Sequence, residues 1–543
     1  MQPLPLLLAF SACVLAENLS NIRLSGPSTL PPDASKYLNP ALASFSIETA
    51  FWTSYVGNVS NPNILTQNLL ENIKSRTGVP AEIRVGGITA DSTYWSSTLD
   101  VALFNFITDD GTLHNTTVGP EFWKTMNLLP EGTKIIFNLS PSIEEQDLEN
   151  LDFEGALDMA TAAVENMKAG QLIGMEIGNE PDHYLHFTPQ SYTNLWMPWT
   201  KNISDALNIS APFFQIAATA EDPLWPYGTA AANAQLDCAS ALAVGANNDS
   251  TVKTCSEHTY QYSVCDPVRL RQATLVNLVN HTRLAQYLDL WQPRIQSVRE
   301  QLGSDSFVIG EYNSVSCSGR DGVSNTFGQA LWLLDTTLYA ASINVSRLFV
   351  HQRGPLALQS STQLNHGGLS LYDLWYPIEN LNGPVKVFPS YSAYLFVAEA
   401  IGTSRSLRIG NIYPGRQANG SSITTEMGDE SQGQLVVYGF WDDSLSADFP
   451  VKLALLNLQS YNETTEGTRP STTFDISEYL SEYEDSVTVR RLQAPGADVK
   501  EGNITTWAGQ TYANGVAEGE LIEEKIVGGE IAVAASEAVL VFL

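Results

Sequence analysis

Two glutamates stand in short motifs at the ends of apolar, strand-like runs of the sequence. Glu180 closes the run LIGMEIGNE over residues 172–180 and is followed by Pro181, and Glu311 lies in the run SFVIGEYN over residues 306–313. A carboxyl group at the tip of a buried strand is held rigidly, and a proline directly after it turns the chain away. The two side chains are therefore candidates for chemistry that needs paired carboxyl groups.

The hydrolysis of a glycosidic bond requires such a pair. One carboxyl group must be protonated beside the leaving oxygen, and the other must be ionised beneath the anomeric carbon. When the two groups lie about 5 Å apart, the ionised carboxylate attacks the sugar itself and the anomeric configuration is retained. This chemistry becomes available only if the two runs of sequence meet in the fold.

Short apolar runs alternate with helix-like segments between residues 41 and 353, and there are eight of them. They cover residues 41–48, 81–87, 132–140, 172–180, 213–220, 252–260, 306–313 and 347–353. Segments between them, such as ILTQNLLENIKSRTG, repeat apolar residues three and four apart, as in a helix packed on a sheet. The pattern predicts an α/β fold with a (β/α)8 barrel over residues 37–376, whose active site lies at the C-terminal strand ends. The alternative, an open doubly wound sheet, would bring a glycine-rich loop after its first strand, where the sequence reads FSIETAFW.

Further polar residues stand at the same ends of the predicted strands. Glu48 ends the first strand, Asn179 ends the fourth just before the glutamate, and Tyr260 ends the sixth. Arg84 lies within the second strand and Asp91 follows it. We expect these side chains to gather at the mouth of the barrel.

Some of these positions have plain structural interpretations. Glu48 can cap a helix or pair with a cation, and Arg84 can be an interior arginine that pairs with Glu82 or another carboxylate. His183 and His186 have a spacing that suggests a metal, but no third ligand is near them in the sequence. We therefore expect no metal site.

From residue 377 the pattern changes. Strand-like runs such as QLVVYGFW and VKLALLNLQSY are separated by clusters of Gly, Asn, Asp and Ser, and strong helical periodicity disappears. This is typical of an antiparallel β-sandwich, which we predict over residues 377–543. We expect residues 17–36 to pack on this β-domain.

The N-terminus and the cysteines indicate export. MQPLPLLLAFSACVLAEN has the apolar run and small residues of a secretory signal, which predicts a signal peptide over residues 1–16; a buried N-terminal helix is the alternative. Cleavage leaves four cysteines, which suit two disulfides with three possible pairings in an oxidising compartment. These disulfide candidates are Cys238, Cys255, Cys265 and Cys317.

Sequons and charge bear on location and partners. In addition to the glycosylation candidates given at the end of this paragraph, the sequence has a sequon at Asn138, which lies at a strand end. The net charge of −31 argues against nucleic acid and anionic membrane surfaces, and no run after the signal is long enough to span a bilayer. We expect a secreted, extracellular monomer with a carbohydrate partner. The glycosylation candidates are Asn18, Asn58, Asn115, Asn202, Asn208, Asn248, Asn280, Asn344, Asn419, Asn462 and Asn503.

Taken together, the motifs resemble glycoside hydrolase family 79, the β-glucuronidases and heparanases. GNEP on the fourth strand and GEYN on the seventh carry the resemblance, with FSIET, RVGG…AD, HTY and the trailing β-domain. The resemblance implies that Glu180 is the general acid/base and Glu311 the nucleophile of a secreted, exo-acting β-glucuronidase that works by double displacement without a cofactor. Alternatives are a β-glucosidase or β-xylosidase of the same clan, or a non-catalytic glycan-binding barrel.

The resemblance also implies roles for the other polar residues. Tyr260 would donate a hydrogen bond to the nucleophile, and Arg84 would lie close to it. Asn179, Glu48 and Asp91 would bind sugar hydroxyls.

One part of the sequence departs from the family pattern. Members of the family bind the uronic carboxylate largely with a tyrosine and backbone amides in the loop after the nucleophile. Here that loop reads SVSCSGRDG, and the nearest tyrosine is Tyr312, beside the nucleophile. We expect backbone amides around Ser318 and Gly319, helped by Arg320 or by Arg353, to hold the carboxylate.

Overall fold

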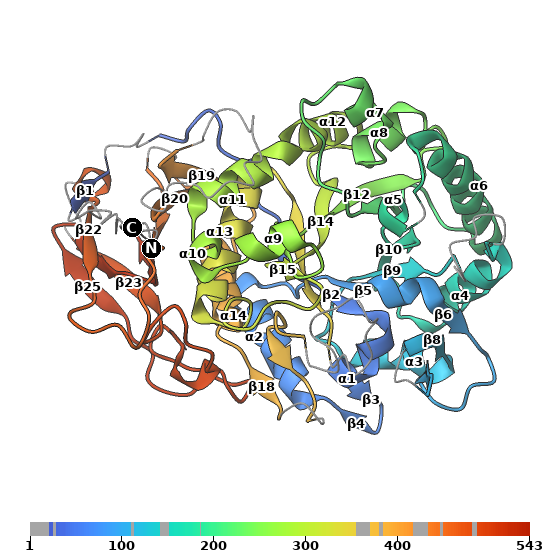
Figure 1. Cartoon of the computed structure of the whole chain (residues 1–543), viewed down its shortest axis with the longest axis horizontal. Coiled ribbons are helices and arrows are strands. Elements are labelled where there is room, and N and C mark those ends of the chain that lie inside the picture. The colour runs from blue at the N-terminus through green and yellow to red at the C-terminus, as the bar shows by residue number, and fades with distance from the viewer. Residues whose placement is uncertain are drawn as a thin grey trace, which may run out of the picture.

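The chain forms a closed barrel with a β-domain beside it (Figure 1). This computed structural model describes residues 21–24, 29–109, 113–141, 151–184, 186–354, 370–379, 384–415, 433–445, 449–480 and 486–543. The predicted signal peptide lies outside these residues. Among them, no helix is long and apolar enough to cross a membrane.

The barrel consists of eight parallel strands, as predicted. Their order in the sheet is β10-β9-β5-β2-β16-β14-β12-β11, and the amide of Glu180, just after β10, donates to the carbonyl of Ala218 in β11 at 2.9 Å, which closes the ring. Most strand residues are buried, because helices cover the outside and side chains fill the inside. The strands are β2 (Ala43–Glu48), β5 (Ile83–Gly86), β9 (Ile135–Leu139), β10 (Leu172–Ile177), β11 (Phe214–Thr219), β12 (Val252–Thr259), β14 (Phe307–Tyr312) and β16 (Arg347–Gln352).

Amphipathic helices follow the strands around the ring. In α2 (Ile64–Thr77), Leu69 and Leu70 are buried. The Asn63 side chain accepts from the amide of Thr66 and caps the first turn, and the helix ends at a glycine with positive φ. Other helices of the outer layer are α4 (Phe153–Asn166), α6 (Pro189–Leu207), α8 (Cys238–Ala243) and α12 (Gln292–Leu302).

Two helices lie between the barrel and the β-domain. Every residue of α13 (Phe327–Ser342) is buried, as is nearly every residue of α14 (Ser390–Ile401). Figure 1 shows them side by side between the two parts of the molecule, and they contact each other. Because α14 is apolar on all sides, it has no helical period, and our sequence interpretation assigned its residues to the β-domain; the structure places it against α2 and β2 of the barrel.

The β-domain contains two sheets with an apolar core between them. The larger sheet is antiparallel, and its residues Val437, Leu455 and Val541 pack with Phe474 and Ile531 of the smaller sheet. The larger sheet consists of β19 (Leu407–Tyr413), β20 (Leu435–Asp442), β21 (Lys452–Asn457), β27 (Glu537–Phe542), β23 (Ser486–Gln493) and β24 (Thr506–Trp507), with β25 (Glu524–Val527) paired to β23. The smaller consists of β1 (Asn21–Arg23), β22 (Ser471–Asp475) and β26 (Glu530–Ala534).

The described part of residues 17–36 contacts the β-domain. Strand β1 pairs in parallel with β22, and the amide of Ser35 donates to the carbonyl of Ile409 at 2.8 Å. The other face of the larger sheet belongs to the barrel core, through residues such as Val436 and Leu456. Both faces of this sheet are therefore covered, which braces the barrel against the β-domain.

Candidate active site

A cavity of about 460 Å³ opens at the C-terminal ends of the barrel strands. Its wall is formed by residues that end or follow β2, β10, β11, β12, β14 and β16. Five of the predicted site residues line it: Glu48, Asn179, Glu180, Tyr260 and Glu311. These five residues come from distant parts of the sequence, and the structure brings them together at the strand ends, as predicted.

The two glutamates face each other across this cavity. A carboxylate oxygen of Glu180, one of Glu311 and a ring nitrogen of His258 all lie within 4.8 Å of one another. Carboxyl groups about 5 to 5.5 Å apart are typical of glycosidases that retain configuration, and inverting enzymes leave a wider gap for water. The separation suits direct attack by one carboxylate on the sugar. Three such groups can also hold a cation, but the carboxylate spacing already fits the sugar chemistry.

Glu180 is positioned by an unusual backbone turn at the end of β10. Gly178 and Glu180 have φ values of +74° and +49°, in the left-handed region that a residue other than glycine rarely adopts. Pro181 then begins the short helix α5 (Pro181–Tyr184). The turn aims the carboxylate at Nδ1 of His258, 2.8 Å from Oε1. Strain of this kind is kept where the surrounding structure fixes it, often at functional sites.

Glu311 lies within β14 and is surrounded by donors. The Tyr260 hydroxyl donates to Oε1 at 2.9 Å, the Arg84 guanidinium donates to Oε2 at 2.9 Å, and Nδ1 of His351 lies 3.7 Å from Oε2. Burial alone would raise its pKa, but the positive charges of His351, His258 and Arg84 and the Tyr260 hydrogen bond outweigh it and hold the pKa of Glu311 well below its usual range. The carboxylate therefore stays ionised.

Arg84 is fully buried and belongs to this network, although it does not line the cavity. Its guanidinium donates to Glu176 at 2.8 Å and to Asn179 at 2.9 Å, in addition to Glu311. The alternative of an interior arginine paired with a carboxylate thus matches its contact with Glu176, whereas Glu82 binds Arg347 instead, at 3.1 Å. Glu176 was missed by the sequence interpretation, although a charged residue inside the apolar run LIGMEI is the signal that could have found it.

Asp91 fixes the turn after β10. Its Oδ1 accepts the backbone amide of Asn179 at 2.8 Å, and Asp91 is not among the residues that line the cavity. Burial raises its pKa well above the usual range. Its carboxyl group thus holds Asn179, which lines the cavity and binds Arg84, and the binding of a sugar hydroxyl by Asp91 stays a prediction.

Glu48 is held at the cavity wall by two neighbours. Oε1 accepts from the amide and the hydroxyl of Thr89, at 2.7 and 2.6 Å, and Oε2 lies 3.1 Å from Nε2 of His351. Its side chain does not cap the 3-10 helix that directly follows it, Thr49–Phe51, but accepts an amide in the first turn of the 3-10 helix Ile88–Ser92. Gly87, with φ +89°, passes so close that an added Cβ would lie 2.6 Å from the carboxylate. The salt-bridge alternative for Glu48 thus matches its contact with His351, and the carboxylate still lines the cavity.

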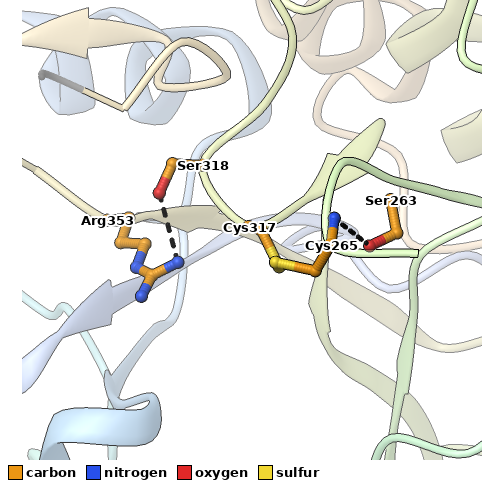
Figure 2. Close-up of a disulfide and its surroundings, with 5 residues drawn as sticks. All are labelled: Ser263, Cys265, Cys317, Ser318 and Arg353. Carbon is orange, nitrogen blue, oxygen red and sulfur yellow. Dashed lines mark hydrogen bonds between the residues drawn. A yellow bond between two sulfur atoms is a disulfide. The ribbon is translucent and has the colours of Figure 1, made fainter. Parts of the chain in front are cut away.

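A disulfide forms part of the cavity wall (Figure 2). It joins Cys265 to Cys317, beside the short paired strands β13 (Tyr262–Ser263) and β15 (Val315–Ser316). The loops after the sixth and seventh barrel strands are therefore cross-linked at the cavity that Glu311 also lines.

An arginine directly after β16 lies beside the loop that follows the disulfide. Figure 2 shows the guanidinium of Arg353 directed at Ser318, whose hydroxyl accepts its hydrogen bond at 3.2 Å. Arg353 lines the cavity. Arg320, which we had predicted as a substrate contact, is used elsewhere: it donates to the carbonyls of Leu270 and Ala273, both at 2.8 Å, and does not line the cavity.

Cys238 and Cys255 correct the prediction of two disulfides. Both are free and buried, at the start of α8 and within β12. The Cys238 thiol lies 3.7 Å from the carbonyl of Ser256. Burial raises the pKa of both thiols, which disfavours the thiolate that disulfide exchange requires.

The described sequons differ in exposure. Asn280 is buried, and its side chain accepts the amide of Arg283 as the cap of α11 (His281–Leu288), so the prediction that it carries a glycan does not fit the folded chain. Asn18 and Asn419 lie outside the described residues. Asn115 and Asn344 are half-buried, and the exposed sequons are Asn58, Asn202, Asn208, Asn248, Asn462 and Asn503.

The fold and the site together define a glycoside hydrolase barrel with its carboxyl pair on the fourth and seventh strands. A sequence profile described as the C-terminal β-domain of glycosyl hydrolase family 79 matches residues 437–540. A β-glucuronidase of Aspergillus niger is 28% identical, over 95% of this chain and 91% of its own, and one of Neurospora crassa is 26% identical, over 91% and 88%. By these matches the chain is similar to the β-glucuronidases of glycoside hydrolase family 79 over nearly its whole length.

Solved structures agree on the architecture. A 4-O-α-L-rhamnosyl-β-D-glucuronidase from Fusarium oxysporum superposes with a TM-score of 0.73 at 22% identity, over 96% of this chain and 100% of that one. A family 51 arabinofuranosidase from Xanthomonas axonopodis pv. citri gives 0.59 at 12% identity, over 96% and 98%. At these identities the likeness concerns the fold.

Proposed function

We propose that this protein is a secreted, exo-acting β-glucuronidase that hydrolyses glucuronide-bearing glycans with retention of configuration. The observation that carries the proposal is the approach of the Glu180 and Glu311 oxygens to within 4.8 Å in one cavity. The names of the relatives from Aspergillus niger and Neurospora crassa support the sugar.

In the first step, the Glu311 carboxylate attacks the anomeric carbon while the Glu180 carboxyl gives its proton to the glycosidic oxygen. The bond to the aglycone breaks as the bond to Glu311 forms, and the aglycone leaves as an alcohol. Tyr260 and Arg84 keep Glu311 ionised until this moment.

In the second step, Glu180 has lost its proton and acts as a base. It takes a proton from a water molecule, the water oxygen bonds to the anomeric carbon, and the ester bond to Glu311 breaks. Glu311 returns as a carboxylate and Glu180 as a carboxylic acid. His258, 2.8 Å from Glu180, holds the acid/base in place through both steps.

Arg353 is the partner that we assign to the uronic carboxylate. Its guanidinium faces the cavity beside Ser318, and the backbone turns through Cys317, Ser318 and Gly319 with φ values of +62°, +74° and +85°. Arg269 also lines the cavity but forms an ion pair with Asp222. A local cation is needed because the net charge of −31 repels an anionic substrate.

A panel of aryl β-glycosides tests the proposal. We expect kcat/KM for the glucuronide to exceed that for the glucoside and the xyloside by at least about tenfold. Glu311→Gln is the inactive reference. Equal rates on neutral sugars would contradict the uronide assignment, and a wild-type protein no more active than this variant would indicate a glycan-binding protein.

The role of Arg353 has a matched control in Arg320. Arg353→Met should lower kcat/KM for the glucuronide by about 10- to 100-fold and leave the glucoside little changed, because a charge-assisted hydrogen bond is lost for one substrate only. Arg320→Met removes an equally large cation that does not line the cavity. Equal losses on both sugars, or equal effects of both variants, would contradict the assignment.

Export and mode of action are tested separately. If residues 1–16 are a signal peptide, the secreted protein begins at Glu17 and migrates as a glycosylated monomer. An exo-acting enzyme releases only monosaccharide from the non-reducing end of an oligosaccharide, and the early appearance of internal fragments would contradict it.

A further inference from the structure

Glu176 is a buried carboxylate one layer behind the nucleophile. It lies in β10, is 1% exposed and does not line the cavity. Oε2 accepts from Nε of Arg84 at 2.8 Å and from the amide of Asn138 at 2.9 Å, and Oε1 accepts from the amide of Gln215 at 2.7 Å. Three neighbouring strands thus supply donors to one carboxylate, as a buried ionised group requires.

Arg84 is shared between Glu176 and the nucleophile. Its Nε binds Glu176, and its Nη1 binds Glu311 at 2.9 Å and the hydroxyl of Ser46 at 3.1 Å. One cation therefore stands between two carboxylates. When the nucleophile becomes an ester it loses its charge, and Arg84 keeps a charged partner only because Glu176 is present.

We propose that Glu176 is a positioning residue that holds Arg84 and limits how strongly Arg84 stabilises the free carboxylate of Glu311. The proposal rests on the double displacement described above. A carboxylate that Arg84 stabilises too strongly is a weaker nucleophile in the first step and a better leaving group in the second. Glu176 shifts this balance towards attack on the sugar.

The groups around the nucleophile set the sign of the effect. Glu311 faces Arg84 of β5, His258 of β12 and Tyr260 after it, His351 of β16, and the acid/base after β10. In Glu176→Gln the shape is kept, but one negative charge near Arg84 is removed. Arg84 then acts on Glu311 alone, so protonation of the nucleophile requires a lower pH.

The experiment compares the two chemical steps in Glu176→Gln. For an alkyl β-glucuronide, kcat/KM reports formation of the ester, and we expect it to fall about tenfold, with its acidic limb at lower pH. For an aryl glucuronide whose leaving group departs easily, kcat reports hydrolysis of the ester, and we expect it to stay unchanged or rise. A merely structural role would lower both steps together.

Glu82→Gln is the matched control. It breaks another buried pair, with Arg347, at the opposite end of the same strands, and should leave the pH profile unmoved. Glu176→Asp keeps the charge and should keep the acidic limb, which provides a second variant if the glutamine protein folds poorly in thermal melting. Two results would overturn this inference and leave the proposed function standing. One is that Glu176→Gln slows both steps equally with the acidic limb of its pH profile unchanged. The other is that Glu82→Gln gives the same pH profile as Glu176→Gln. A wild-type protein inactive on every β-glycoside would overturn the proposed function and this inference with it.

Discussion

The two glutamates on opposite sides of the active-site cavity have different surroundings. Glu311 lies inside strand β14, where the register to β12 and β16 shifts, with a tyrosine, an arginine and a histidine around its oxygens. Glu180 lies beyond the end of its strand, on a left-handed turn, with one histidine at 2.8 Å and a side chain that is 11% exposed. One carboxylate is thus fixed in its ionised form, and the other can exchange a proton with the substrate and water.

This difference shows how the barrel assigns roles. The neighbours of Glu311 come from β5, from β16 and from the residue after β12, and Arg84 and His351 among them are buried, so the charge is set by the scaffold. Glu180 contacts His258 and lines the cavity. The roles that we propose for the two glutamates follow from these different surroundings.

Removing the nucleophile should have the largest effect. Glu311→Ala leaves no group to form the ester, and we expect kcat to fall by about 10⁴-fold or more. Added azide can occupy the space and attack from the same side, giving a glycosyl azide of inverted configuration from an activated substrate. Product analysis by NMR checks this, and an azide product of retained configuration would exchange the roles of the two glutamates.

Removing the acid/base should depend on the leaving group. Glu180→Gln loses proton donation, so we expect a fall of about 10²- to 10⁴-fold for an alkyl glucuronide. The fall in ester formation should be much smaller for a nitrophenyl leaving group, which needs no proton. A plot of rate against leaving-group pKa measures the difference, and a loss independent of the leaving group would contradict the assignment.

Tyr260→Phe should disturb the Glu311 side only. The variant removes the hydroxyl that donates to Oε1, so the ionised form is less stabilised and the pKa of Glu311 rises towards its usual value. We expect a loss of about tenfold in kcat/KM and an acidic limb displaced to higher pH. A limb that stays in place would mean that Tyr260 has only a packing role.

The smallest effect concerns folding. Because the pKa of Glu311 is lowered in the folded chain, its contribution to stability is present above the ordinary carboxyl pKa and is lost as the pH falls towards the lowered value. Relative to the Tm of Glu311→Gln, the Tm of the wild type should therefore fall by about 2 to 4 °C when the pH is lowered from 6 to 3. Calorimetry at several pH values measures it, and a difference independent of pH would contradict the pKa argument.

The sequence predicted those features that depend on local pattern. Eight strands alternate with amphipathic segments, and the glutamates stand at strand ends, so their meeting follows from the closure of the barrel. Helix α14 escaped because it is buried on all sides and has no polar face. Contacts between distant parts of the chain could not be predicted either. The sequence does not show that Glu176 shares Arg84 with Glu311, or that Arg353 rather than Arg320 faces the cavity.

The cysteines show the same limit. Four residues of one type have three possible pairings, and only the positions of their loops in space select Cys265 with Cys317. Cys255 lies in barrel strand β12 and Cys238 at the start of helix α8, and burial disfavours the thiolate of both. Pairing in space, rather than residue type, decides which thiols join.

The measurement that tests the central claim most directly is the anomeric configuration of the first product. ¹H NMR of an aryl β-glucuronide mixed with the enzyme resolves the newly released sugar before it mutarotates. Two displacements between carboxyl oxygens within 4.8 Å of each other predict that β-glucuronic acid forms first and the α-anomer appears later. If the α-anomer forms first, a single displacement by water has occurred, and Glu311 is not the nucleophile.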